Sequence, residues 1–483
     1  MPSLQGVESH LGKLDQVDKP SRLALSRAKV ERFRQVPGHW LLGVLSQLGP
    51  GAKFITQKIE EWSLMYGQEG VFEMNLAGSR SVVVCSWEQA HHVLSRRPFK
   101  VTRGSKIQNA SDIFAFLFTS EGERWKRERR VLAPFFNSKS VESHVGAIEE
   151  VAQQLLLEID KDASKGKVDF SALLPLYSAE VVCKTALGQE LQLLATRNDE
   201  ITSDIKRLFQ AVQLRYFSPI PYWKIPGLGW LIDNGAEISG RFDRRSEEVL
   251  NNASRSRKSI AQKLMDMDGD RFTHKELLEN VAGLFVAGTD TTSLTTCWAF
   301  YHLARDQELQ TKVAEEVRSL PDHEVSSAQL DSFPLLQALW LETLRCHGPL
   351  TFMDLEATEP VTLAGRKLPE GTTIFLALRS ILRNDPEVKK ELGDDLHDFR
   401  PSRWLGPEGL NRHPPFDALP YGYGPRICVG MRLADYEARL AIAKVVHRFV
   451  LEKWDRRPLI ETMTTVGNQP EEPVAISVRL RAT

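Results

Sequence analysis

One cysteine stands in a setting that suits chemistry rather than packing. Cys428 lies in the stretch YGYGPRICVG, with Arg426 two residues before it and Gly430 two residues after it. Gly422 and Gly424 predict a loop, and the apolar spacing after Gly430 predicts a helix. The N-terminal end of a helix lowers the pKa of a nearby thiol and favours the thiolate, the form that attacks as a nucleophile or binds a metal.

A nucleophilic cysteine needs a neighbouring base. The loop around Cys428 contains no histidine, and the nearest histidines in the sequence are His413 and His447. A thiol flanked by glycines and lacking a base is a poor nucleophile candidate. The sequence therefore disfavours a cysteine hydrolase.

A second group of polar residues interrupts a long predicted helix that runs from Thr273 to Arg305. Thr273 and Glu276 predict a capping box, and apolar residues recur with helical spacing. The middle of the helix reads AGTDTTSLTT, where a glycine, a carboxylate and several hydroxyls have poor helix propensity. Such a local conflict is expected at a site or at a strained position.

The chemistry of this interruption lies in adjacent residues. Asp290 and Thr291 would offer an acid and a hydroxyl at one notch, and the small residues Ala287 and Gly288 would let something flat lie against the helix. The alternative is a buried helix whose threonines bond back to its own carbonyls. In that case Asp290 would belong to a structural ion pair.

Two pairs of residues could support the cysteine loop. Glu342 and Arg345 lie three positions apart on an apolar helix, and a buried pair of this kind needs further partners, such as Arg403 just upstream of the loop. Trp125 and Arg129 lie four positions apart on another predicted helix, where both can donate to a carboxylate. The alternatives are a solvated ion pair and a basic solvated face.

The bulk composition is that of an ordinary globular protein. The chain has 483 residues, of which 42% are hydrophobic and 26% charged, with a formal net charge of -1. This balance gives no indication of nucleic-acid binding. Five scattered cysteines without zinc spacing favour a reducing, intracellular compartment over secretion.

Residues 1–35 predict a tail without a signal peptide or a transmembrane anchor. The basic segment SRLALSRAKVERFRQV, which begins at Ser21, could lie on a membrane surface or form a solvated helix. The protein is therefore expected in the cytoplasm or peripherally on a membrane.

Helical patterning dominates the chain. Residues 70–85 predict two strands joined by a turn, strand-like pieces recur at residues 358–378, and the last residues alternate like a strand. A sheet built from both ends requires the ends to meet, which favours one large domain. We expect a mostly α fold with a small β region, in a single domain over residues 36–483.

Taken together and in this order, these segments resemble the cytochrome P-450 family of haem-thiolate monooxygenases. YGYGPRICVG matches the family's Phe-x-x-Gly-x-Arg-x-Cys-x-Gly signature, AGTDTT its oxygen-activating helix, and Glu342-x-x-Arg345 its Glu-x-x-Arg helix. FRPSRW resembles the Pro-x-Arg segment, and Trp125-x-x-x-Arg129 matches the helix that contacts the haem propionates. The resemblance covers most of the chain and implies one cytochrome P-450-like domain.

The resemblance also implies a cofactor and roles for these residues. Haem b would be bound with Cys428 as the thiolate ligand of its iron. Asp290 and Thr291 would organise water and deliver protons to bound dioxygen. The other residues expected against the cofactor are Gly288, Tyr421, Gly424 and Gly430.

Two departures from the family's pattern concern the surroundings of the haem. Tyr421 stands where the signature has phenylalanine, and its hydroxyl needs a partner. The stretch PLTFMDLEATE, after the Glu-x-x-Arg helix, lacks the basic residue that often reaches a propionate. The propionate donors named from the sequence are Trp125, Arg129 and Arg426.

Substrate and electrons complete the expectations. The residues named as substrate contacts are mostly apolar, which implies a lipophilic small molecule. They are Ile113, Phe114, Phe116, Phe285, Ala287, Phe352 and Met463. Electrons would come from NAD(P)H through a separate reductase or ferredoxin, docked on the basic residues 126–130 and on Arg432. The chain is expected to be a monomer.

Other functions stay open. A haem-thiolate isomerase or dehydratase would act on hydroperoxides without dioxygen, but such relatives typically lose the acid–threonine pair that Asp290 and Thr291 form here. A non-catalytic haem or gas sensor would need a signalling module, and none is visible in the sequence.

Overall fold

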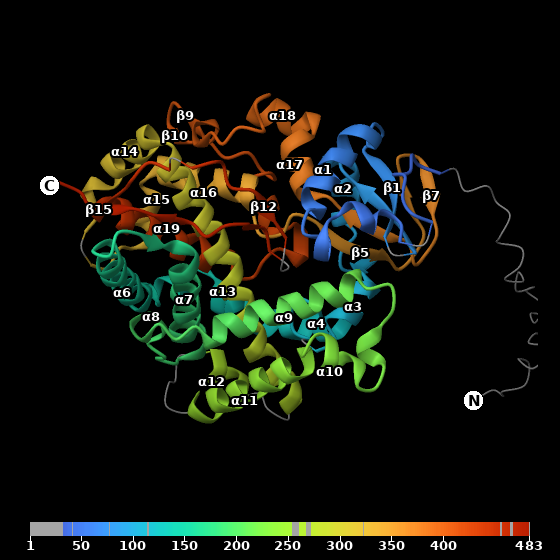
Figure 1. Ribbon diagram of the computed structural model, residues 1–483, viewed down its shortest axis with the longest axis horizontal. Coiled ribbons are helices and arrows are strands. Elements are labelled where there is room, and N and C mark those ends of the chain that lie inside the picture. The colour runs from blue at the N-terminus through green and yellow to red at the C-terminus, as the bar shows by residue number, and fades with distance from the viewer. Residues whose placement is uncertain are drawn as a thin grey trace, which may run out of the picture.

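The computed structural model in Figure 1 describes residues 32–40, 42–76, 78–113, 115–253, 260–266, 272–321, 323–454, 456–463 and 467–482. Phe114 and most of the basic N-terminal segment, both singled out from the sequence, lie outside these residues. Phe33 is buried, and its N–H donates to the Glu73 carboxylate at 3.1 Å. The packed domain therefore already includes residue 33.

The domain is organised around α13 (His274–Arg305), a helix of 32 residues that crosses the middle of Figure 1. Thr273 caps it: the hydroxyl accepts from the Glu276 N–H, and the Glu276 carboxylate accepts from the Thr273 N–H. Residues on several faces of α13 are buried, as expected for a helix inside a large domain. The helix and the capping box predicted from the sequence are confirmed.

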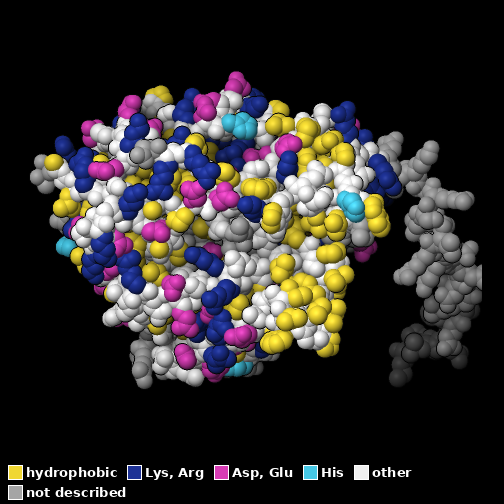
Figure 2. All heavy atoms as spheres, viewed as in Figure 1, with side chains coloured by type: hydrophobic (Ala, Val, Ile, Leu, Met, Phe, Trp, Pro, Cys, Tyr) yellow, Lys and Arg dark blue, Asp and Glu magenta, His cyan; other side chains and the backbone are white. Residues whose placement is uncertain are grey.

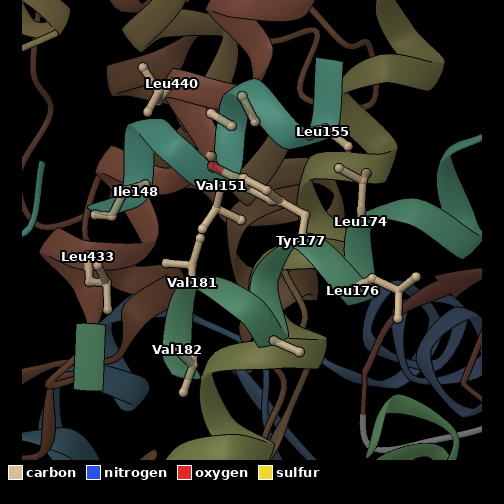
Figure 3. Close-up of a cluster of buried hydrophobic side chains, with 14 of the residues drawn as sticks. Ile148, Val151, Leu155, Leu174, Leu176, Tyr177, Val181, Val182, Leu433 and Leu440 are labelled. Atoms are coloured by element: carbon tan, nitrogen blue, oxygen red, sulfur yellow. The ribbon is translucent and has the colours of Figure 1, made fainter. Parts of the chain in front are cut away.

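Helices from both halves of the chain pack against α13. They are α7 (Phe170–Val182), α9 (Glu200–Phe217), α11 (Gly235–Ala253), α16 (Pro334–His347) and α19 (Met431–Arg448). Figure 3 shows how α7, α19 and α6 (Val145–Ala163) share a core, with Tyr177 among aliphatic side chains. The Tyr177 hydroxyl donates to the backbone oxygen of Glu437 at 3.1 Å, so its polar atom is satisfied inside this core.

The segment Phe170–Leu187, which comprises α7 and its π-helical continuation, has the length and composition of a membrane span. However, 83% of its 18-residue apolar window is buried inside the domain. This degree of burial fits a core helix. It is the one candidate span among the described helices.

The main sheet lies at the right of Figure 1 and has the strand order β1-β2-β8-β5-β3. Its strands are β1 (Val71–Leu76), β2 (Ser79–Val84), β8 (Thr373–Leu376), β5 (Met353–Ala357) and β3 (Val101–Arg103). Only β2 and β8 run parallel within this sheet. The two strands predicted over residues 70–85 are confirmed as β1 and β2.

The end of the chain corrects one expectation. Strand β15 (Val478–Leu480) pairs with β11 (Phe449–Leu451), directly after α19, and does not join the main sheet. The alternating pattern predicted the strand correctly, but it carries no information about the partner strand. In Figure 1, β15 lies at the left, across the domain from β1.

The other described elements are shorter or peripheral. The helices are α1 (Ile55–Tyr66), α2 (Trp87–Leu94), α3 (Ser105–Ala110), α4 (Gly122–Leu132), α5 (Ser138–Glu142), α8 (Leu193–Thr196), α10 (Leu228–Ile232), α12 (Ile260–Met265), α14 (Gln307–Glu316), α15 (Ser327–Asp331), α17 (Leu378–Asn384) and α18 (Pro386–Leu392). The paired strands are β4 (Val168–Asp169) with β14 (Ala475–Ile476), β6 (Val361–Leu363) with β7 (Arg366–Leu368), β9 (Leu405–Gly406) with β10 (Gly409–Leu410), and β12 (Glu461–Thr462) with β13 (Gln469–Pro470).

Candidate functional site

The loop that ends in Cys428 and the notch in α13 line the same cavity, whose volume is about 300 Å³. Residues of α4, α9 and α16 contribute to its wall as well. Its lining is mostly apolar, apart from a group of arginines and the polar residues of α13. The two groups that the sequence marked as chemical are therefore brought together.

The geometry of the cysteine loop holds one sulfur at the start of a helix. Cys428 opens onto the cavity two residues before Gly430, which caps α19. Burial raises the pKa of the Cys428 thiol, whereas the N–H groups of Gly430 and Met431 and the charge of Arg129 act to lower it. Two backbone N–H groups at the start of α19 therefore favour the thiolate, against the effect of burial.

Glycine is needed at three positions around Cys428 for two different physical reasons. Gly422 and Gly424 have φ angles of 96° and 65°, which other residues rarely adopt. Gly430 has an ordinary φ of -83°, and a Cβ added there would lie 4.0 Å from the Cys428 sulfur. Gly422 and Gly424 therefore shape the loop, whereas Gly430 faces the sulfur.

Tyr421, the departure from the signature, finds a partner for its hydroxyl. Trp340 of α16 donates its indole N–H to the Tyr421 oxygen at 3.2 Å. The backbone oxygen of Tyr421 accepts from the Cys428 N–H at 2.8 Å. Both aromatic residues line the cavity.

The notch in α13 presents an acid and a hydroxyl to the cavity. Asp290, Thr291 and Ala287 all line it, and the Thr291 hydroxyl donates to the backbone oxygen of Ala287 at 2.8 Å. Burial raises the pKa of Asp290 to about 6, and the charge of Lys206 opposes this shift. No described residue forms an ion pair with Asp290, so the structural-pair alternative finds no support in this part of the chain.

The two small residues of the notch face different neighbours, one the cavity and the other helix α7. Ala287 faces the cavity, whereas Gly288 does not line it. A Cβ added at Gly288 would lie 2.4 Å from a methyl carbon of Val182 on α7. The prediction that Gly288 lies against a flat cofactor is corrected, because its glycine is required by helix packing.

Arginines make one end of the cavity strongly basic. Arg97, Arg103 and Arg426 line it, and the carboxylate beside them belongs to Glu121, 2.8 Å from Arg426. Several of their nitrogens have no hydrogen-bond partner in the described chain, namely Nε and Nη2 of Arg97, Nε of Arg103 and Nη1 of Arg426. Glu121 also lies 4.0 Å from Arg97, whereas Arg103 forms no ion pair with a described residue, so this end of the cavity keeps a surplus of positive charge.

Buried arginines of this kind call for an anionic ligand. Burial lowers the pKa of Arg97 to about 10 and that of Arg103 well below its ordinary value. A guanidinium nevertheless stays protonated in proteins, so its cost of burial must be offset by an anion. Unpaired donors in a fork geometry suit carboxylates.

Sequence reasoning missed Arg97 and Arg103. Strand β3 pairs with β5, the strand after the Glu-x-x-Arg helix, and Arg103 lies opposite Leu355. Arg103 therefore brings a basic side chain to the cavity from the strand beside β5. The strand pairing reveals the position of Arg103, whereas Arg97 lies in the turn segment before β3 and matches no motif in the sequence.

The other residues named as carboxylate donors lie at the same end. Trp125 lines the cavity, and the Arg426 guanidinium lies over its ring at 4.7 Å from the centroid. Arg129 lines the cavity too, but donates to the backbone oxygen of Ile427 at 2.7 Å. Arg129 therefore also holds the cysteine loop.

Behind the loop, Glu342 is the centre of a buried network. Its carboxylate accepts from Arg345 at 2.8 Å and from Arg403 at 2.9 Å, with all three side chains at most 1% exposed. Trp404 and the Arg400 N–H also donate to it, at 2.9 and 2.8 Å. Four donors thus surround the carboxylate. Burial acts to raise the pKa of Glu342, but the hydrogen bond and charge of Arg345 and the charge of Arg403 outweigh it, so the pKa is lowered.

The residues named as substrate contacts divide into two groups. Phe116 and Ala287 line the cavity. Ile113 and Phe285 do not line it, because Phe285 packs within one core cluster and Ile113 packs between two. The prediction for these two residues is corrected, since helical spacing does not distinguish a cavity wall from the core.

Phe352 and Met463 also lie outside the cavity lining. Phe352 stacks on Phe375 with 4.6 Å between ring centroids, and Met463 is buried in the same cluster. Phe114 lies outside the described residues. The apolar wall also includes Phe209, Val212 and Leu284, which were not predicted from the sequence.

Comparison with known proteins agrees with this site. The family Cytochrome P-450 matches residues 34–476 of the chain. The cytochrome P-450 CYP13A7 of Caenorhabditis elegans is 26% identical, over 91% of this chain and 92% of its own length. Cytochrome P-450 71A20 of Arabidopsis thaliana is 25% identical over 88% of each chain, and cytochrome P-450 4c21 of Blattella germanica is 22% identical over 76% and 77%.

The chain belongs to the cytochrome P-450 family. In general terms it is a haem-thiolate oxidoreductase of the monooxygenase type with a single, mostly helical domain. The cofactor that this family implies is haem, whose two propionates match the surplus positive charge around Arg97, Arg103 and Arg426.

Proposed function

We propose that this protein inserts one oxygen atom from O2 into a lipophilic small molecule. The observation that carries the proposal is that Cys428, Asp290 and Thr291 line one mostly apolar cavity. An iron-binding thiolate and a proton-donating pair are both needed for this chemistry, and here they face the same space.

The residues present fit haem. Cys428 would bind the iron, and Trp125, Arg97, Arg103 and Arg426 would hold the propionates at the basic end of the cavity. When bound, the haem would supply the activation of dioxygen, favoured by a thiolate ligand. Backbone N–H groups beside the sulfur would tune its electron density.

Asp290 and Thr291 would move protons at the cavity side of α13. A carboxyl with a pKa of about 6 can hold or release a proton near neutral pH. The Thr291 hydroxyl, which now donates to the Ala287 oxygen, would rotate to hand a proton to the cavity. The apolar wall around them would exclude bulk water from this transfer.

Electrons would reach this site from NAD(P)H through a separate redox partner. Arg130 on α4 and Arg432 on α19 are exposed near the cysteine loop, and Lys126 on α4 is half-buried, which supports a docking face there. Lys126 is paired with the exposed Glu123 at 2.5 Å, so its charge is partly compensated. Arg130 and Arg432 would then contribute most to docking.

We also propose that the protein is a monomer, cytoplasmic or peripherally bound to a membrane. Exposed apolar side chains gather at the lower right of Figure 2, near α10. They include Ile220, Ile225, Trp230, Leu231 and Ile232. Such a surface supports contact with lipid, and sedimentation with neutral vesicles would test it.

Labelled dioxygen distinguishes the proposed reaction from its alternative. Ligands that shift the haem spin state would first be identified as substrate candidates. With NAD(P)H and a reductase, the product should carry one labelled oxygen atom. A product formed from a hydroperoxide without O2 would instead support a haem-thiolate isomerase or dehydratase.

A further inference from the structure

Tyr421 is joined to two parts of the site at once. Its hydroxyl accepts from the Trp340 indole N–H at 3.2 Å, and its backbone oxygen accepts from the Cys428 N–H at 2.8 Å. Trp340 belongs to α16, two residues before Glu342. A continuous line of hydrogen bonds therefore runs from α16 through Tyr421 to the cysteine.

The α16 end of this line is rigidly held. Trp340 is 1% exposed, and the next turn of its helix carries Arg345, which is paired with Glu342 in the buried network. Phenylalanine at position 421 would keep the ring but leave the buried Trp340 N–H without its acceptor. A buried donor that loses its partner is costly, whereas removal of both partners costs much less.

At the cysteine end of this line, a small displacement of the backbone would change the surroundings of the Cys428 sulfur. The sulfur of Cys428 interacts with the N–H groups of Gly430 and Met431, and such contacts set the properties of a metal-bound thiolate. A shift of the Cys428 backbone would alter both contacts. Because the Cys428 N–H donates to Tyr421, the position of Tyr421 affects where the Cys428 sulfur lies.

We propose that Trp340 and Tyr421 form a positioning pair that holds the Cys428 thiolate in place. The proposal rests on the proposed haem-thiolate function. The phenol at position 421 is then a matched partner of the indole on α16, and the pair substitutes for the phenylalanine packing of the family signature. Neither residue is expected to take part in the chemical steps.

The test uses the haem-loaded full chain and the variants Y421F, W340F and W340F/Y421F. The rate at which the carbon monoxide complex of the reduced protein loses its red-shifted Soret band measures release of the thiolate. Y421F should raise this rate about fivefold, corresponding to one lost hydrogen bond. The double variant should lie within about twofold of the wild type, because both polar partners are gone.

Y423F is a matched control in the same loop. The Tyr423 hydroxyl bonds to His91 at 3.1 Å, away from α16, so its loss should leave the rate and the haem reduction potential unchanged. Y421F should shift that potential, which mere destabilisation of the fold would not do.

Equal rates of thiolate release in Y421F and the wild type would overturn the positioning pair. A double variant whose rate increase equals the product of the two single-variant increases would overturn it as well. A wild-type protein without the shifted band would instead overturn the proposed function. The two failures are thus distinguishable.

Discussion

Arg426 and Glu121 form an ion pair at 2.8 Å that leaves the second terminal nitrogen of the guanidinium, Nη1, without a hydrogen-bond partner in the described chain. Arg97 and Arg103 line the same end of the cavity with further unpartnered nitrogens. This arrangement is prepared for an anion with more than one carboxylate. It would hold the haem propionates without a basic residue on β5.

R103L should therefore weaken haem binding. Loss of a hydrogen bond to a charged carboxylate costs about 1.5–3 kcal/mol, or about ten- to a hundredfold in affinity. Titration of apoprotein with haem measures the effect. The control is R80L, because Arg80 is on the same sheet but paired with Glu73 and half-exposed. Unchanged affinity in R103L would exclude a propionate role.

Removal of the central carboxylate should destabilise the domain. E342Q leaves the buried Arg345 without its counter-charge and leaves Arg403 with Asp395 alone, which is expected to cost about 3–5 kcal/mol of unfolding free energy. Denaturant unfolding of the haem-loaded protein checks this. E308Q breaks an exposed pair with Lys312 and should leave the stability unchanged. Wild-type stability in E342Q would contradict the structural role.

Proton delivery predicts a specific phenotype for T291A. Haem binding should be retained, while the yield of product per NAD(P)H falls by about tenfold because the Thr291 hydroxyl could no longer pass protons into the cavity. Product and peroxide are measured together. T296A is the control: Thr296 makes the same bond one turn back, to the Thr292 oxygen, but does not line the cavity. Full coupling in T291A would remove this residue from the proton path.

Acid should destabilise the fold through His302. Its Nε2 lies 2.7 Å from Nε2 of His347, and burial followed by the charge of His347 lowers its pKa well below 6.5, against the charge of Glu461. Below pH 6.5 the unfolded chain therefore binds a proton that the folded chain does not. The free energy of unfolding is therefore unaffected by His302 above pH 6.5 and decreases as the pH falls below that value.

H302Q keeps a hydrogen-bonding side chain but cannot titrate. The slope of unfolding free energy against pH should therefore be smaller in H302Q than in the wild type between about pH 5 and 6.5. H323Q, at an exposed histidine, serves as the control. An unchanged slope in H302Q would show that His302 is not the titrating group.

The sequence was most informative where chemistry constrains residue type. Cys428, Asp290 and Thr291 could be placed on their elements because a thiol at a helix start and an acid within a helix violate ordinary patterns, and the structure brings them to one cavity. Glu342 and Arg345 could be paired because helical spacing fixes their distance. These are local relationships.

Relationships across the chain could not be predicted. Arg103 reaches the cavity only because β3 pairs with β5, and a single sequence does not specify strand partners. Phe285 was named as an apolar substrate contact, yet it lies in the core. Apolar periodicity marks burial and does not distinguish a wall that faces a ligand from one that faces other side chains.

The spectrum of the reduced protein under carbon monoxide tests the central claim most directly. Haem bound through the Cys428 thiolate predicts a red-shifted Soret band, and C428S or C428H should abolish the shift while the fold survives. An unshifted, histidine-type band in well-folded wild-type protein, or a shifted band that persists in C428S, would contradict the account.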